Sequence, residues 1–210
     1  MKITPVKTPK FIKFLLPKLI WTLPDNEQSV YLTFDDGPTP EITDWTLDQL
    51  KAYNAKATFF CIGKNVVLYP EIYNRIIEEG HTVGNHTQNH LNGWKTKTSV
   101  YLEEVANAKN FINSRLFRPP YGLIKPQQAK ALIKIGYTII MWNVLSFDWN
   151  KSVAKQQCLD NVLKNTSSGD IVVFHDSVKA SKNMMFALPK VLEELSEKNF
   201  KFKCIPERFQ

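Results

Sequence analysis

Residues 29–38 read Ser-Val-Tyr-Leu-Thr-Phe-Asp-Asp-Gly-Pro, and this segment is the most informative one about the fold. From Ser29 to Phe34 the residues are mostly apolar, β-branched or aromatic, which is typical of a buried strand. The run ends in two aspartates, Asp35 and Asp36, before a Gly-Pro turn. A buried strand that ends in polar residues, followed by a helical pattern, predicts a βαβ unit with a parallel sheet.

The same alternation continues along the chain. Strands are predicted at residues 29–34, 56–62, 81–84, 116–118, 137–144 and 171–175, with 200–205 as a candidate closing strand. Helices are predicted at residues 41–53, 71–79, 98–114, 126–135, 153–165 and 188–198. About seven such repeats favour a compact (β/α) barrel over an open sheet, and barrels of this kind carry their active sites at the C-terminal ends of the strands.

Length and composition narrow the class of protein. A chain of 210 residues, 43% hydrophobic and 22% charged, suits one globular domain, which we expect to be a monomer. The net charge of +7 is interpreted mainly as a contribution to solubility; the alternative is that it helps to bind an anionic polymer. The lysines look scattered and no nucleic-acid motif accompanies them, so no nucleic-acid partner is expected. Three cysteines without CxxC spacing argue against a disulfide framework and a cysteine metal site.

The N-terminal residues 1–24 form a basic and apolar arm ahead of a catalytic domain predicted at residues 25–210. Lys13, Pro17 and Lys18 interrupt its apolar run, so neither a cleavable signal peptide nor a membrane-spanning helix is expected. Two interpretations stay open: the arm packs on the domain, or residues 8–22 contact a membrane surface. The expected location is cytoplasmic or peripheral to a membrane.

Two motifs suggest a metal site. Adjacent carboxylates at Asp35 and Asp36 repel one another, which indicates a cation or unequal protonation, although a helix-capping turn is the alternative. His86 and His90 are four residues apart and would share one face of a helical turn, where both could bind one metal. Two histidines and a carboxylate leave open positions for hydrolytic chemistry. His81 is interpreted as structural.

Three further motifs follow predicted strands. Residues 118–122 (Arg-Pro-Pro-Tyr-Gly) suggest a stiff groove wall, or an ordinary loop. Residues 142–149 place Asp148 among aromatic rings. There the Asp could orient a histidine, and a Trp could line an apolar pocket or stack on a sugar; the alternative is an aromatic core with an Asp in a loop. The strand at residues 171–175 ends in His175, which is placed for general acid work, or is a satisfied histidine at the edge of the core.

The five motifs, in this order, resemble those of the NodB-type polysaccharide deacetylases (carbohydrate esterase family four), over roughly residues 29–205. The resemblance implies a distorted α/β barrel short of a full eight-unit ring. It implies hydrolysis of N-acetyl groups on a polysaccharide that contains N-acetylglucosamine, such as peptidoglycan or chitin. It also implies a divalent metal, for which the ligand types favour Zn²⁺ over Co²⁺, Ni²⁺ or Mn²⁺.

The resemblance also implies residue roles. It makes Asp35 the general base, oriented by Arg118, and His175 the general acid, paired with Asp148. The implied metal ligands are Asp36, His86 and His90, with Thr87 steadying their loop. The implied substrate-binding residues are Tyr121, through its backbone N–H at the oxyanion, Trp149 and Val173, as walls of the acetate pocket, and Pro120.

Three positions depart from the family pattern. Leu145 stands where the family often has another Asp, Leu91 where a Pro often follows the second histidine ligand, and Val173 where Leu is usual. None of these removes a ligand, the base or the acid. An O-acetyl esterase of the same fold and a catalytically silent carbohydrate-binding protein remain the alternatives, and the polymer is not readable from the sequence.

Overall fold

The computed structural model describes residues 5–24 and 27–207. Residues 1–4 of the predicted arm, and residues 25–26 and 208–210 of the predicted domain, lie outside the described residues. No helix in the described part of the chain combines the length and the apolar character that crossing a bilayer requires.

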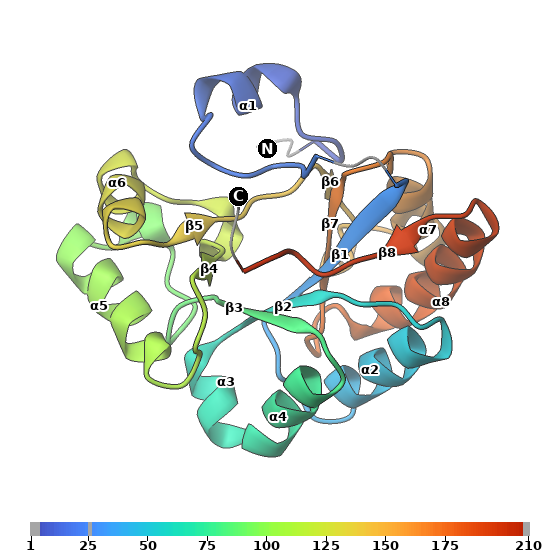
Figure 1. Cartoon of the computed structure of the whole chain (residues 1–210), viewed down its shortest axis with the longest axis horizontal. Coiled ribbons are helices and arrows are strands. Elements are labelled where there is room, and N and C mark those ends of the chain that lie inside the picture. Colours follow the sequence, from blue (N-terminus) through green and yellow to red (C-terminus); the bar gives the residue numbers. More distant parts are fainter. Residues whose placement is uncertain (1–4, 25–26, 208–210) are drawn as a thin grey trace.

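A parallel sheet forms the centre of the molecule (Figure 1). Its strands follow the order β5-β4-β3-β2-β1-β7-β6, and β8 also pairs with β1. Every pairing between these strands is parallel. The strands are β1 (Ser29–Asp35), β2 (Thr58–Cys61), β3 (Thr82–Asn85), β4 (Leu116–Phe117), β5 (Thr138–Ile139), β6 (Val144–Leu145), β7 (Ile171–His175) and β8 (Lys201–Phe202). The predicted distorted barrel of about seven parallel strands is confirmed.

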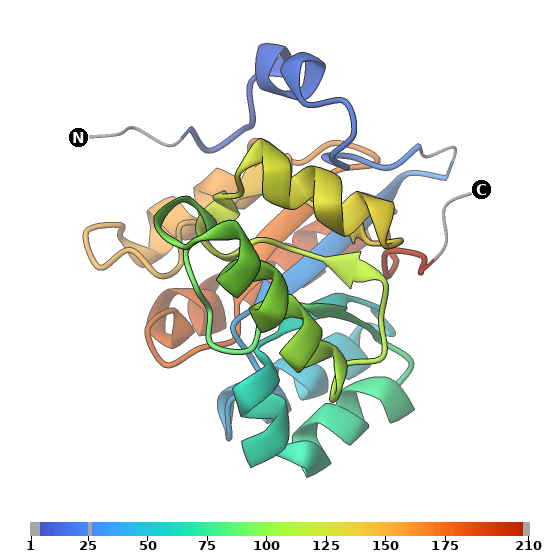
Figure 2. The ribbon, with the colours of Figure 1, turned by 90° about the vertical axis from the view of Figure 1, so that its left-hand side faces the viewer.

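Helices cover the outside of this curled sheet, as Figures 1 and 2 show from two sides. The helices are α1 (Lys10–Leu15), α2 (Ile42–Ala52), α3 (Gly63–Leu68), α4 (Pro70–Glu78), α5 (Thr98–Lys109), α6 (Pro126–Lys134), α7 (Lys155–Leu163) and α8 (Ser181–Glu197). Two short 3₁₀ turns, Gly93–Lys95 and Pro120–Gly122, lie in loops. Parallel crossovers require such a covering layer, which explains why the strands read as continuous apolar runs.

The central strand β1 is buried at every residue. Phe34 stacks between Phe59, at a ring-centroid distance of 5.0 Å, and Phe174, at 6.0 Å. These three rings tie the neighbouring strands β2, β1 and β7 together near the ends where their polar residues begin. The core therefore fixes the positions of the side chains that follow it.

The single strand predicted at residues 137–144 is wrong, because the structure holds two short strands at opposite ends of the sheet path. Between them Met141 N–H donates to the carbonyl of Ile20 at 2.7 Å. Ile20 and Thr22 bridge to Ile140 and Asp170 respectively. The second half of the arm therefore lies in the gap between the two sheet edges.

The arm is partly built into the core. Leu19, Trp21 and Leu23 are buried against residues of β4, β5 and β7. In contrast, no residue of α1 is buried. Residues 19–23 thus pack on the domain, whereas α1 stands above it (Figure 2).

Two helices differ from the prediction. The structure contains α3, a short helix for which no element was predicted. The predicted start of the last helix at residue 188 is wrong, because α8 begins at Ser181 and carries Pro189 in its interior. Buried residues on both sides of the proline, Met184 and Val191 among them, hold the helix together through tertiary packing.

Candidate active site

The C-terminal ends of the strands meet around one small pocket of about 170 Å³. Parallel pairing places Asp35 of β1 directly opposite His175 of β7. The predicted site residues that line the pocket are Asp35, Asp36, His86, His90, Tyr121, Trp149, Val173 and His175. Three others are buried and absent from the lining: Arg118, Pro120 and Asp148. The structure therefore brings together motifs that end or follow five different strands, namely β1, β3, β4, β6 and β7.

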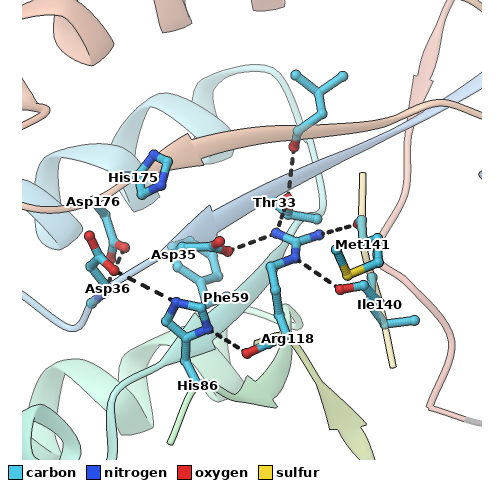
Figure 3. Close-up of polar contacts among 12 residues, drawn as sticks. Thr33, Asp35, Asp36, Phe59, His86, Arg118, Ile140, Met141, His175 and Asp176 are labelled. Atoms are coloured by element: carbon cyan, nitrogen blue, oxygen red, sulfur yellow. Dashed lines mark hydrogen bonds and ion pairs between the residues drawn. The ribbon is translucent and has the colours of Figure 1, made fainter. Parts of the chain in front are cut away.

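Arg118 lies wholly inside the protein beside Asp35 (Figure 3). Its Nη1 donates to Oδ1 of Asp35 and to Oγ1 of Thr33, both at 2.7 Å. The rest of the guanidinium donates to the carbonyls of Ile140, at 3.3 Å, and Met141, at 2.9 Å. Burial lowers the pKa of Arg118 against the opposing charge of Asp35. A buried charge pair with this many hydrogen bonds holds the Asp35 carboxylate in one orientation.

Asp36, His86 and His90 form a cluster whose ligand atoms lie within 4.8 Å of one another. Oδ1 of Asp36 is 3.1 Å from Nε2 of His90 and 3.8 Å from Nε2 of His86. This oxygen is buried and is otherwise without a hydrogen-bond partner among the described residues. Burial opposes the charge on Asp36, but the hydrogen bond from His90 and the nearby histidines hold its pKa well below the ordinary value.

The tautomer of His86 shows that a cation fits this cluster. Nδ1 of His86 lies 2.7 Å from the carbonyl of Arg118, so Nδ1 carries the proton and Nε2 presents a lone pair to Asp36. Burial lowers the pKa of His86 to about 4, which keeps the ring neutral. A lone pair that faces a carboxylate is unfavourable unless a cation lies between them. Two imidazoles and one carboxylate are the donor set of an open metal site.

The helical turn predicted for residues 86–90 is wrong. The chain after β3 is an irregular loop in which Thr87 has φ 65° and His90 has φ 58°. Thr87 Oγ1 accepts a hydrogen bond from Leu91 N–H at 3.3 Å, and the ring of His90 packs edge-on against Tyr121 at 4.6 Å. The two histidines reach one carboxylate because the loop reverses, and not because they share a helix face.

His175 is held by Asp148. Oδ1 of Asp148 lies 2.8 Å from Nδ1 of His175, and Oδ2 accepts the backbone N–H of His175 at 2.7 Å. Burial works against the charged imidazole, but the charge and hydrogen bond of Asp148 raise the pKa of His175 to about 9. The ring of Trp149 packs edge-on against His175 at 4.8 Å. This shift favours the protonated form of His175 at neutral pH.

The remaining pocket wall comes from the loops after β4 and β5 and from the end of β6. Gly122, Trp142 and Leu145 line the pocket, although Gly122 and Trp142 were not among the predicted site residues. Gly122 has φ 66°, and a Cβ there would lie 2.4 Å from Trp142. Trp142 begins the aromatic segment at residues 142–149, but the sequence carries no signal that its ring meets Gly122. Tyr121 is 61% exposed at the rim of the pocket.

Asp176 and Thr43 were not predicted as part of the site. Asp176 accepts hydrogen bonds from Gly37 N–H, at 3.0 Å, and from Thr43 Oγ1, at 2.5 Å. Burial raises the pKa of Asp176 to about 8, and the hydrogen bond from Thr43 works in the opposite direction. A Cβ at Gly37 would lie 2.0 Å from Asp176 Oδ2. The glycine after Asp36 is therefore required for this contact, which fixes the loop that carries Asp36.

His81 lies apart from the pocket. Its Nδ1 accepts the backbone N–H of Ala57 at 3.2 Å, and its ring meets Phe59 edge-on at 5.5 Å. Burial, aided by Lys56, lowers its pKa to about 4. The structure thus places His81 between β2 and β3 as a neutral side chain with a hydrogen-bond partner.

The sequence is similar to a known protein family and to several of its characterised members. Residues 22–140 match the model of the polysaccharide deacetylase family. A peptidoglycan-N-acetylglucosamine deacetylase of Bacillus cereus is 36% identical over 195 residues, covering 89% of this chain and 91% of that protein. The peptidoglycan-N-acetylmuramic acid deacetylase PdaC of Bacillus subtilis is 30% identical over 205 residues, covering 95% of this chain and 42% of that protein.

Solved structures of polysaccharide deacetylases share the fold of this chain. The crystal structure of the Bc1960 peptidoglycan N-acetylglucosamine deacetylase superposes with a TM-score of 0.88 at 34% identity, and the match covers 97% of each chain. BA3943, a family pseudoenzyme from Bacillus anthracis, superposes with a TM-score of 0.74 at 26% identity, over 87% of this chain and 65% of that one. The family model, the relatives and the fold agree, and this chain belongs to the polysaccharide deacetylase family.

Proposed function

We propose that this chain is a metal-dependent hydrolase that removes N-acetyl groups from a polysaccharide containing N-acetylglucosamine. One observation carries the proposal: a single pocket combines three metal-type ligands, a carboxylate fixed by a buried arginine, and a protonated histidine. Amide hydrolysis needs these three functions, namely an electrophilic centre, a base and an acid. The related deacetylases named above act on peptidoglycan, which makes peptidoglycan the first polymer to test.

Asp36, His86 and His90 would hold the metal. When bound, a divalent cation supplies Lewis acidity to acyl transfer. Two imidazoles and a carboxylate favour Zn²⁺, with Co²⁺, Ni²⁺ and Mn²⁺ as alternatives. The contact of His86 with the Arg118 carbonyl keeps its Nε2 available as a ligand atom.

Asp35 is proposed as the general base. Its Oδ1 is committed to Arg118, so its second oxygen is the one left to accept a proton from the attacking water. His175 is proposed as the general acid for the leaving amine. Its Nδ1 is committed to Asp148, so Nε2 is the nitrogen left to donate. Because Asp35 and His175 are opposite one another on neighbouring strands, base and acid face one substrate.

The pocket walls are proposed to bind the acetyl group. Trp149 and Val173 provide an apolar surface for its methyl, and the backbone N–H of Tyr121 is proposed to stabilise the oxyanion. Pro120 is buried and outside the pocket lining, so its contribution would run through the position of Tyr121.

Acetate release tests this proposal against its two alternatives. The Zn²⁺-loaded protein is incubated with N-acetylglucosamine oligomers, peptidoglycan and acetylated xylan, with and without a chelator. We expect chelator-sensitive release from the N-acetylated substrates. Release from xylan alone would favour an O-acetyl esterase. Binding without release from any substrate would favour a silent protein, as in the family pseudoenzyme.

Membrane contact through residues 8–22 is a separate proposal, which the surface of α1 supports. Phe11 and Phe14 are 63% and 83% exposed, beside Lys10 and Lys13. Deleting residues 1–24 would also remove buried side chains, so a Phe11→Ser/Phe14→Ser protein is the cleaner probe. Sedimentation with anionic vesicles should fall in this variant and stay unchanged in Phe111→Ser, a control elsewhere on the surface. Equal sedimentation of all three proteins would contradict the contact.

A further inference from the structure

Four lysines surround a hollow of about 900 Å³ beside the active-site pocket. We call it the lysine basin, defined by Lys151, Lys155, Lys179 and Lys182. All four side chains are exposed. The lysines looked scattered along the sequence, but the fold brings two pairs together from segments that lie far apart in the chain.

The basin belongs to the same end of the barrel as the pocket. One wall runs from the loop after Asp148 into the start of α7, and the other runs from the loop after His175 into the start of α8. Asn183 links the two walls, because its Nδ2 donates to the carbonyls of Asp148, at 3.2 Å, and Val153, at 3.1 Å. The basin and the pocket are thus built on the two sides of the pair formed by Asp148 and His175.

No described carboxylate neutralises the positive charge of the lysine basin by an ion pair. None of the four lysines makes an ion pair with any carboxylate that the structure describes. The acid that lines the hollow, Asp148, is buried and bonded to His175. Lysine ammonium groups that share one hollow repel one another, and a bound anion would relieve this repulsion.

The active-site pocket is too small to enclose a polymer, so surfaces beside it would also contact the substrate. A volume of about 170 Å³ is well below the roughly 300–1,000 Å³ of sites that enclose a whole small ligand. The pocket therefore accepts the acetylated part of one sugar, and the rest of a polymer lies outside it. Groups attached to that sugar or its neighbours would meet the loops that form the basin.

We propose that the lysine basin binds carboxylate or phosphate groups carried by the glycan whose acetylated sugar occupies the pocket. This inference rests on the proposed function and extends it to substrate class. It makes the protein selective for an anionic glycan, such as one with acidic sugars or peptide stems, over a neutral N-acetylglucosamine polymer. Electrostatic attraction of this kind acts mainly on encounter and binding, and salt screens it.

The test compares three glycans of equal length: a neutral N-acetylglucosamine oligomer, one that bears carboxylates, and the same fragment with the carboxylates amidated. A fourth, with phosphate monoesters, distinguishes the two kinds of anion. The variant is Lys151→Gln/Lys179→Gln/Lys182→Gln. The matched control, Lys51→Gln/Lys109→Gln/Lys134→Gln, removes the same charge from exposed lysines on α2, α5 and α6.

Each exposed ion pair changes affinity by a factor of about two to five, so we expect the basin variant to lose roughly tenfold in kcat/KM on the anionic glycan, mostly through KM. Turnover of the neutral and amidated glycans should be unchanged, and the salt dependence seen with the anionic glycan should flatten. The control variant should resemble the unmodified protein. Equal kcat/KM for the basin variant and the unmodified protein, or equal losses in the two variants, would overturn the proposal.

Binding of the same glycans by Asp35→Asn protein separates this inference from the proposed function. If no glycan releases acetate from the unmodified protein but anionic glycan still binds through the basin lysines, the deacetylase assignment fails and the basin stands. If the neutral oligomer is deacetylated and the basin lysines do not increase binding or turnover of the anionic glycan, the deacetylase assignment stands and the basin proposal fails.

Discussion

Asp148 holds His175 at two points, through the imidazole Nδ1 at 2.8 Å and through the backbone N–H at 2.7 Å. The side-chain contact sets the tautomer and favours the charged ring, and the backbone contact fixes where β7 ends. One carboxylate therefore controls both the position and the protonation of the proposed acid.

Replacing Asp148 by Asn should move the pH profile of the reaction. His175 has a pKa raised to about 9, so kcat should fall as the pH rises through that value. In Asp148→Asn the raising charge is gone, and the fall should occur at lower pH, with kcat at pH 8 reduced by roughly a hundredfold or more. A pH profile measured on N-acetylglucosamine oligomers checks this, and an unshifted limb would contradict the pairing.

The same pKa shift should appear in the stability of the metal-free protein. Because the pKa of His175 in the folded protein, about 9, exceeds the ordinary histidine value of 6.5, its contribution to stability is fully present below pH 6.5. It should be lost as the pH rises from 6.5 through 9, at a cost of roughly 1–3 kcal/mol. Urea unfolding at pH 6 and pH 9.5 measures it. In His175→Gln this part of the pH dependence should be absent, and an identical slope in both proteins would contradict the shift.

Arg118→Met should destabilise the protein strongly, because it leaves Asp35 buried without its cation. Removing one partner of a buried pair costs about 3–5 kcal/mol. Urea unfolding of Arg118→Met, Asp35→Asn and the double variant forms a double-mutant cycle. We expect the double variant to be more stable than Arg118→Met alone. Strict additivity would mean that the two side chains are energetically independent.

Gly37→Ala should damage the metal site from outside it. The new Cβ would lie 2.0 Å from Asp176 Oδ2, so Asp176 or the loop must move. We expect a loss of about 1–3 kcal/mol in stability and about tenfold or more in metal affinity. Thr43→Val, which removes the hydroxyl that binds Asp176, should show a smaller effect in the same direction, and Thr43→Ser should not. Unchanged metal affinity in Gly37→Ala would contradict this support role.

Metal titration should distinguish the two histidines that are proposed to bind the metal from His81, which is not. His86→Ala and His90→Ala should each lower Zn²⁺ affinity by several orders of magnitude, because each removes one of three ligands. His81→Ala is the matched control and should keep the metal, whatever it does to stability. Calorimetric titration of the metal-free proteins measures the affinities. Loss of metal in His81→Ala but not in His90→Ala would contradict the ligand set.

The sequence predicted those features of the fold that follow from local patterns. The apolar runs ending in Asp35 and His175 are strands in the structure, and their polar ends do meet at one pocket. The break between β5 and β6 was missed because an apolar run at residues 139–142 joins the two strands in the sequence. In the structure this run is interrupted by long-range contacts such as the hydrogen bond from Met141 N–H to the carbonyl of Ile20.

In the site, residue types were readable but backbone geometry was not. The spacing of His86 and His90 suggested a helix, whereas positive φ at Thr87 and His90 produces the loop. Nothing in the sequence linked Asp176 to Gly37, because that contact joins strands that are neighbours only in the sheet. Such contacts depend on register, which short-range patterns do not encode.

Acetate release by Asp35→Asn protein that retains its metal tests the proposed deacetylase mechanism. Zn²⁺ content is measured first and should match that of the unmodified protein, because Asp35 is not among the three ligands. The unmodified protein should release acetate from N-acetylglucosamine oligomers, and the fully metallated variant should be slower by roughly a thousandfold. Release at an unchanged rate by the metallated variant would contradict the assignment of Asp35 as the base.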